Sequence, residues 1–173
     1  LDADLEALAE RLTSKPRPQL TMGPLTKEYE EKFAQQLGVT YAVAVNSGSS
    51  ANALMAYALL RSGRLKNKKV VVPSAAWITS VSPFVRLKEY EPIMCEADPD
   101  NWGLDPIHLE EILEQHQPAT VMLVHVLGVP ANMEQIIQLQ QKYKFFLLED
   151  ACAALGSTYA EQKVGTFGIM SSV

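Results

Sequence analysis

The sequence lacks a long uninterrupted apolar run. The longest candidate, residues 70–85, is broken by Pro73 and Pro83 and contains several hydroxyl residues, whereas a membrane-spanning helix needs about 18 or more apolar residues in a row. The acidic start, LDADLE, is also unlike a signal peptide. These absences predict a soluble, intracellular protein that does not bind a membrane.

Cysteine and concentrated positive charge are also scarce. The two cysteines, Cys95 and Cys152, lie far apart, so neither a disulfide framework nor a zinc or other metal site is indicated, and a reducing cytoplasm fits best. Fifteen basic and twenty acidic residues give a formal charge of −5, with the positive residues scattered. Binding to nucleic acid is therefore not expected, and an anionic substrate would have to be held by local groups.

Short apolar runs alternate with stretches of helical spacing. Strands are predicted at residues 41–45, 69–73, 91–96, 120–125 and 145–150. Helices are predicted at residues 2–14, 27–37 (capped by Thr26), 50–62, 74–87, 105–115 and 133–142. This alternation is typical of βαβ units, and it predicts an α/β, three-layer αβα fold with a mostly parallel sheet. Ligands of such sheets bind at the carboxyl ends of the strands.

The stretch VNSGSSAN, residues 45–52, joins the first predicted strand to a helix. Gly48 would let a ligand approach the backbone, the hydroxyls of Ser47, Ser49 and Ser50 can donate, and the first-turn N–H groups carry partial positive charge. One interpretation is a cradle for a phosphate. The other is that Ser and Asn only cap the helix while the glycine makes the turn.

Two further residues stand at predicted strand ends. Asp150 ends an apolar strand, where a carboxylate would need a partner such as a protonated heteroaromatic nitrogen; alternatively it caps the next turn. Trp77 could stack on an aromatic ring or could belong to the core. An anion at Gly48–Ser50, a flat ring on Trp77 and a ring nitrogen facing Asp150 together describe pyridoxal 5'-phosphate.

Several motifs carry a resemblance to a known family. VNSGSSAN (45–52), VVVPSAAWITS (70–80), LVHVLGVP (123–130), LLEDACAALGSTY (147–159) and KVGTFG (163–168) occur in the order and spacing of the DegT/StrS-type sugar aminotransferases, and TMGPLTKEYEEKFAQQLG (21–38) resembles their N-terminal segment. The resemblance implies the pyridoxal-phosphate transferase fold of fold-type I. It also implies homodimers with active sites at the subunit interface, and nucleotide-linked keto sugars as substrates.

The resemblance also assigns roles to particular residues. Gly48 and Ser49, with Ser50 beside them, match the phosphate-binding turn, Trp77 matches the aromatic residue stacked on the cofactor, and Asp150 matches the aspartate paired with the pyridine nitrogen. His125 matches a family histidine and is a further candidate for the cofactor site. The other two histidines, at positions 108 and 116, flank an acidic helix and are expected to be solvated.

The sequence departs from the family pattern at three places. Ala153 stands where many of these aminotransferases have glutamine, and Ile169 where they often have aspartate. The turn SGSSAN resembles the branch that contains sugar 3-dehydratases, in which histidine replaces the Schiff-base lysine. The resemblance places that lysine or histidine beyond Val173, and no lysine of the chain matches its position.

The chain begins with Leu1 rather than Met and stops at residues 171–173 in what reads as a new strand. We therefore expect residues 1–173 to be an N-terminal arm plus most of the pyridoxal-phosphate-binding large domain, without its C-terminal part. The first hypothesis is an aminotransferase of polysaccharide or deoxyamino-sugar biosynthesis that uses a donor such as glutamate. Its variant is a sugar 3-dehydratase, and the alternative from another class is a non-catalytic module that binds a phosphorylated ligand.

Overall fold

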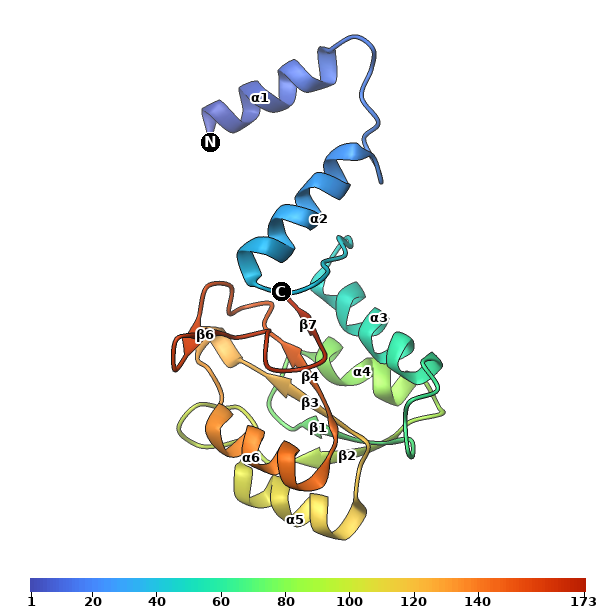
Figure 1. Cartoon of the computed structure of the whole chain (residues 1–173), viewed down its shortest axis with the longest axis vertical. Coiled ribbons are helices and arrows are strands. Elements are labelled where there is room, and N and C mark those ends of the chain that lie inside the picture. The colour runs from blue at the N-terminus through green and yellow to red at the C-terminus, as the bar shows by residue number, and fades with distance from the viewer. The chain divides into compact units, whose positions relative to one another are not determined.

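The computed structural model of the chain describes residues 1–173, which divide into two units, Leu1–Ala44 and Val45–Val173. The first unit contains helix α1 (Asp2–Thr13), which buries no side chain, and helix α2 (Pro24–Leu37) (Figure 1). Helix α2 begins before its predicted start because proline suits the first helical position, so Gly23 rather than Thr26 precedes the helix. It ends, as predicted, at Gly38, which has a left-handed conformation with φ 88°.

The strand predicted at residues 41–45 is wrong. The alternating sequence YAVAV suits a strand, but a strand also needs a hydrogen-bonding neighbour, and no strand of the sheet pairs with this segment. Tyr41 and Val43 remain 85% and 67% exposed. The backbone N–H of Ala44 donates instead to the side chain of Glu30, at 2.7 Å.

A five-stranded sheet lies at the centre of the second unit, in the order β2-β1-β3-β4-β7. Its strands are β1 (Lys69–Pro73), β2 (Glu91–Cys95), β3 (Thr120–Val124), β4 (Phe146–Asp150) and β7 (Met170–Ser172). Every neighbouring pair is parallel, which confirms the predicted sheet. A separate antiparallel ribbon consists of β5 (Thr158–Tyr159) and β6 (Gln162–Lys163).

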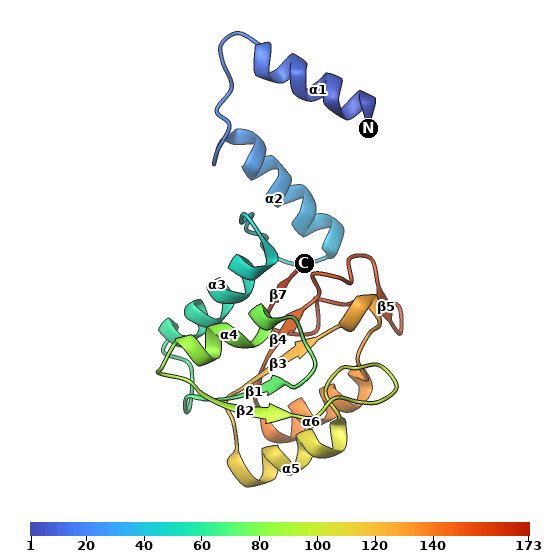
Figure 2. The same ribbon diagram turned by 180° about the vertical axis from the view of Figure 1, so that it is seen from behind.

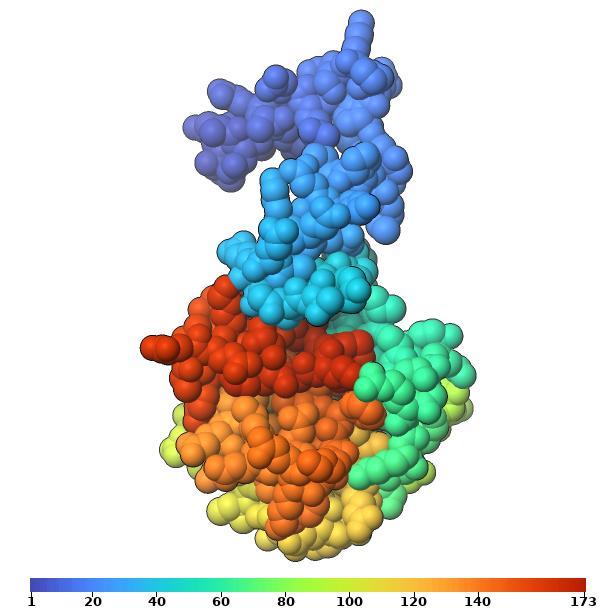
Figure 3. Space-filling view, viewed as in Figure 1, coloured from blue at the N-terminus to red at the C-terminus, as the bar shows by residue number.

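Helices cover both faces of this sheet, as predicted (Figures 1 and 2). On one face, α3 (Gly48–Arg61) and α4 (Ile78–Arg86) pack with one set of strand residues that includes Val70, Met122 and Leu148. On the other face, α5 (Pro106–His116) and α6 (Met133–Tyr143) pack with the alternate set that includes Val71 and Leu147. Figure 3 shows α5 in yellow and α6 in orange on the surface of this unit. The alternation follows from the two-residue period of strands.

Polar residues begin three of these helices. Ser47 accepts a hydrogen bond from the N–H of Ser50 at the start of α3, Asp105 accepts from the first turn of α5, and Asn132 accepts from the N–H of Gln135 at the start of α6. These contacts satisfy first-turn donors that have no acceptor within the helix. Helix α4 begins at Ile78, later than the predicted residue 74, because residues 74–76 form a bend and Trp77 has an extended backbone.

Strand β2 forms one edge of the sheet and contains Pro92. The N–H of Glu91 points toward the sheet, where it donates to the carbonyl of Lys68 at 2.9 Å. Because N–H groups alternate in direction along a strand, the nitrogen of Pro92 lies on the outer side of this edge. None of the helices of the chain combines the length and the apolar composition required to cross a membrane.

Candidate active site

The carboxyl edge of the sheet brings together the start of α3, the start of α4 and the end of β4. Asp150 is the last residue of β4, and its carboxylate receives hydrogen bonds from Asn52 of α3 and Ser80 of α4. Gly48, the first residue of α3, lies against Cys152, two residues after Asp150. Three predicted stretches therefore meet here, because parallel strands present their carboxyl ends on the same side.

Asp150 is buried, with 6% of its surface exposed. Its Oδ2 accepts from Nδ2 of Asn52 at 2.7 Å and from Oγ of Ser80 at 2.6 Å. Its Oδ1 accepts from the backbone N–H of Cys152 at 3.1 Å. All these donors are neutral, and no Lys, Arg or His side chain lies within ion-pair distance of this carboxylate.

The hydroxyl of Ser172 lies near two acceptors, at 2.6 Å from Oδ1 of Asn52 and 3.3 Å from Oδ1 of Asp150. A hydroxyl has one proton to donate, and the shorter distance assigns that proton to Asn52. The contact fixes the amide of Asn52, so that its Nδ2 faces Asp150. It also leaves Oδ1 of Asp150 with one strong donor, the N–H of Cys152, and with room to accept another.

Opposing effects act on the pKa of Asp150. Burial raises it, whereas the hydrogen bonds from Ser80, Asn52 and Cys152 lower it, and the net result is a pKa below the ordinary value of 3.8. The side chain is therefore ionised at neutral pH. A buried carboxylate that is ionised and held only by neutral donors is suited to bind a cationic group of a ligand.

The turn before α3 is shaped by a close contact. A Cβ atom at position 48 would collide with Sγ of Cys152 unless the Cys152 side chain moved, so the close contact favours glycine. Ser47 caps the helix through Ser50, and Oγ of Ser49 donates to Oγ1 of Thr79 at 3.1 Å. The N–H groups of Gly48 and Ser49 belong to the first helical turn, where no intrahelical acceptor exists. Capping and anion binding are thus compatible at this turn, since different groups serve each.

Trp77 is not part of the core, because 73% of its surface is exposed. It precedes α4 with an extended backbone, and its carbonyl accepts from the N–H of Ser80 at 2.9 Å. Trp77 therefore stands three residues before Ser80, whose hydroxyl donates to Asp150. A large exposed aromatic side chain at this place is available to stack on a ligand.

His125 is buried, and both of its ring nitrogens are engaged within the protein. Its Nδ1 accepts from the N–H of Ala131 at 3.2 Å, and its Nε2 lies 3.0 Å from Oε2 of Glu149. This arrangement leaves no ring nitrogen for a ligand. The structure therefore brings Gly48 and Asp150 together and places Trp77 nearby, while His125 contacts the neighbouring Glu149.

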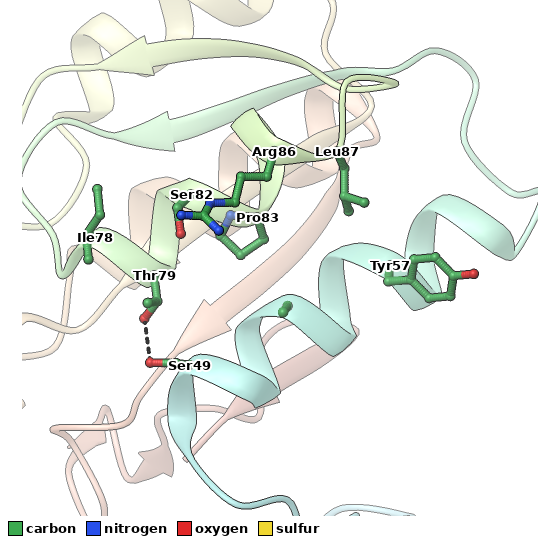
Figure 4. Close-up of a pocket in the computed structure, with 9 residues that line it drawn as sticks. Ser49, Tyr57, Ile78, Thr79, Ser82, Pro83, Arg86 and Leu87 are labelled. Carbon is green, nitrogen blue, oxygen red and sulfur yellow. Dashed lines mark hydrogen bonds between the residues drawn. The ribbon is translucent and has the colours of Figure 1, made fainter.

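An open groove of about 530 Å³ lies between α3 and α4, and its lining does not include Asp150 or Gly48 (Figure 4). Ser49 and Thr79 form one end of the groove through their hydrogen bond, while Arg86 and Tyr57 lie farther along the two helices. Most of the lining is apolar. The groove adjoins the proposed phosphate turn at Ser49 but is separate from the Asp150 carboxylate.

Sequence reasoning missed the side chains around Asp150, namely the donors Asn52 and Ser80 and the residue that orients Asn52, Ser172. Each alone resembles an ordinary capping or turn residue. Asn52 could have indicated this cluster, because it is a polar residue within the otherwise apolar helical stretch ANALMAYALL. In the structure it is only 2% exposed. A buried amide in such a helix requires a polar partner.

The fold is an α/β fold with a parallel sheet, and the candidate site lies at the carboxyl edge of that sheet. A family model matches residues 2–173, and the chain belongs to the DegT/DnrJ/EryC1/StrS aminotransferase family. The resemblance seen in the motifs is thereby confirmed. Proteins similar to this chain include a putative pyridoxal phosphate-dependent aminotransferase of Bacillus subtilis and 3-dehydratases.

Two curated relatives illustrate this range. GDP-perosamine synthase of Escherichia coli O157:H7 is 35% identical over 150 residues, which cover 87% of this chain and 40% of the relative. GDP-4-keto-6-deoxy-D-mannose 3-dehydratase of Escherichia coli O55:H7 is 34% identical over 178 residues, which cover 99% of this chain and 44% of the relative. The chain thus spans less than half the length of these relatives.

Solved structures agree with the fold. The E. coli GDP-4-keto-6-deoxy-D-mannose-3-dehydratase with bound hydrated pyridoxal phosphate superposes with a TM-score of 0.82 and 33% sequence identity, covering 97% of this chain and 43% of that chain. The pyridoxal-phosphate transferase fold predicted from the motifs is therefore confirmed for residues 1–173.

Proposed function

We propose that the protein carrying this chain is a pyridoxal-phosphate enzyme of nucleotide-sugar metabolism, an aminotransferase that moves an amino group from a donor such as glutamate to a nucleotide-linked keto sugar. The family membership supports the class of enzyme. The observation that carries the proposal is the Asp150 carboxylate, which is buried and ionised and has no cationic partner. The proposal includes a cytoplasmic homodimer that serves polysaccharide or deoxyamino-sugar biosynthesis.

The residues of the site fit pyridoxal phosphate. A protonated pyridine nitrogen would supply the positive charge that Asp150 lacks, and Oδ1 has room to accept its proton. The first turn of α3, with Gly48, Ser49 and Ser50, would hold the phosphate, and the exposed Trp77 would cover the ring. When bound, the cofactor supplies an electron sink for negative charge that develops on carbon.

The residues around Asp150 have a defined task in this proposal. Asn52 and Ser80 donate to Oδ2, which lowers the pKa of Asp150 and keeps its carboxylate ionised. An ionised Asp150 in turn favours the protonated state of the pyridine nitrogen that it faces. We assign no Schiff-base residue among residues 1–173.

The proposal is tested with the complete protein. Pyridoxal phosphate should bind with a change in its visible absorption, and incubation with GDP-4-keto-6-deoxy-D-mannose and glutamate should yield an amino sugar detected by mass spectrometry. A protein that does not bind the cofactor would contradict the proposal and favour a non-catalytic binding module. Sedimentation analysis would test the homodimer separately.

A second candidate function is sugar 3-dehydration. The specific observation in its favour is that a 3-dehydratase matches 99% of this chain, whereas the synthase matches 87%. The turn SGSSAN also resembles the dehydratase branch. In the same assay, loss of the C3 hydroxyl without gain of nitrogen would identify the dehydratase, and histidine at the Schiff-base position of the complete protein would agree with it.

A further inference from the structure

A second buried carboxylate, Glu149, lies beside Asp150 but serves different partners. Glu149 is fully buried, and successive residues of a strand point to opposite faces of the sheet. Its Oε2 accepts from the N–H of Gly165 at 2.8 Å and lies 3.0 Å from Nε2 of His125, and its Oε1 accepts from the N–H of Gly168. Both carboxylate oxygens are therefore occupied by groups of the protein.

The hydrogen bonds define the protonation of this cluster. Nδ1 of His125 accepts from the N–H of Ala131, so it carries no proton, and Nε2 must carry the proton that is donated to Glu149. Glu149 therefore faces three donors and acts only as an acceptor. A glutamine at this position could not reproduce the arrangement, because its amide nitrogen would meet an N–H group.

Glu149 accepts hydrogen bonds from both ends of the turn Gly165–Gly168, which leads into β7. The peptide groups of Gly165 are fixed on two sides, since the N–H donates to Glu149 and the carbonyl accepts from Oγ of Ser171 at 2.7 Å. At the other end, a Cβ atom on Gly168 would collide with the carbonyl oxygen of Leu147, so the turn lies directly on β4. The Glu149 carboxylate therefore holds this turn against β4 at both Gly165 and Gly168.

Strand β7 continues from this turn to the Asp150 site. Ser172 of β7 is the register partner of Asp150 in the parallel pair of strands β4 and β7. Its hydroxyl donates to Asn52, and Asn52 donates to Asp150. A continuous set of contacts therefore runs from the Glu149 carboxylate through the turn and β7 to the amide that orients the Asp150 carboxylate.

We propose that Glu149 is a positioning residue of the cofactor site. It acts on Asp150 indirectly, by fixing the position of Ser172. The proposal rests on the proposed function, because the affinity for pyridoxal phosphate is its readout. Glu149 does not touch the ligand in this proposal. It sets the position of β7, and Ser172 then fixes the amide of Asn52.

A double-mutant cycle in the complete protein tests this route, with the dissociation constant of pyridoxal phosphate measured by absorption or fluorescence titration. We expect Glu149→Gln and Ser172→Ala each to weaken binding about tenfold or more, and the double variant to bind no more weakly than the weaker of the two single variants. Ser172→Thr, which keeps the hydroxyl, should lose less affinity than Ser172→Ala. Additive losses in the double variant would overturn the proposal.

Two measurements keep the test decisive. If Glu149→Gln does not give folded protein, the same cycle is run with Ser171→Ala, which removes the hydroxyl that fixes the carbonyl side of Gly165; a non-additive loss with Ser172→Ala supports the route, and an additive one overturns it. A wild-type protein that does not bind pyridoxal phosphate would refute the proposed function. Normal wild-type binding with additive variants would refute only the role of Glu149.

Discussion

Replacing Asp150 by asparagine removes the negative charge of the site with almost no change in shape. The new side chain can keep its oxygen at the Oδ2 position, where Asn52 and Ser80 donate. Its amide nitrogen then lies at the Oδ1 position, facing the N–H of Cys152. The variant therefore loses the acceptor that would hold a protonated ring nitrogen, while most of the local hydrogen bonds survive.

The expected losses differ in size for function and for folding. Removing one member of a buried, hydrogen-bonded charge pair costs about 3 to 5 kcal/mol, which corresponds to a decrease in kcat/KM of about 150-fold to about 5,000-fold. The fold should lose only about 1 to 3 kcal/mol, because a single N–H, that of Cys152, is left without its acceptor. Activity should therefore fall while the protein stays folded.

The measurement compares Asp150→Asn with Asp98→Asn in the complete protein. Asp98 is also a buried aspartate, at 8% exposure, but it bonds only to nearby loop residues through the N–H of Asp100 and the amide of Asn101. Steady-state kinetics and urea unfolding are recorded for both variants. Equal activity in the two variants would refute the assignment of Asp150 to the cofactor.

Four further predictions concern single residues. Trp77→Ala should weaken retention of pyridoxal phosphate by about 1 to 3 kcal/mol if the exposed indole stacks on the ring, and an unchanged dissociation constant would contradict stacking. His125→Gln can keep one acceptor for Ala131 and one donor for Glu149 at a buried position, so cofactor affinity should stay normal in titrations; a large loss would mean that the imidazole itself is needed, either by the ligand or by Glu149. The pKa of Asp150 is lower in the folded protein than its ordinary value of 3.8, so the ionised side chain stabilises the fold at pH values above 3.8. This stabilisation is lost as the pH falls below 3.8 and through the pKa of the folded protein. Urea unfolding between pH 5 and pH 3 should accordingly show a smaller loss in Asp150→Asn than in the wild type. For the thiols, burial raises the pKa of Cys95 to about 12, so peptide mapping after thiol labelling should find the exposed Cys152 modified and Cys95 unmodified until the protein is denatured.

The sequence predicts correctly the strands that pair with other strands of the central sheet. The strand at residues 69–73 was predicted with its final bounds, because a continuous valine run is typical of a strand buried on both faces. The strand at residues 41–45 was wrong for the complementary reason. Its alternating residues satisfy the intrinsic preference for extended structure, but the sheet offers it no neighbour, and single-sequence patterns do not reveal pairing.

The candidate site could be predicted only in part. Gly48, Trp77 and Asp150 each stand next to an element boundary that the pattern marks, and the structure places them around one edge. The donors to Asp150 could not be predicted, because Asn52 lies 98 residues away and Ser80 lies 70 residues away in the sequence. Contacts at such separation depend on how helices dock on the sheet, which local propensity does not specify.

The outer edge of strand β2 has a consequence for handling the protein. Because the nitrogen of Pro92 faces outward and carries no hydrogen, a strand from another molecule that paired there would meet a missing donor. Five-residue edge strands without such a break are templates for intermolecular pairing and aggregation. Substituting Pro92 to raise local rigidity or expression would therefore remove a safeguard, and precipitation at high concentration is the expected penalty.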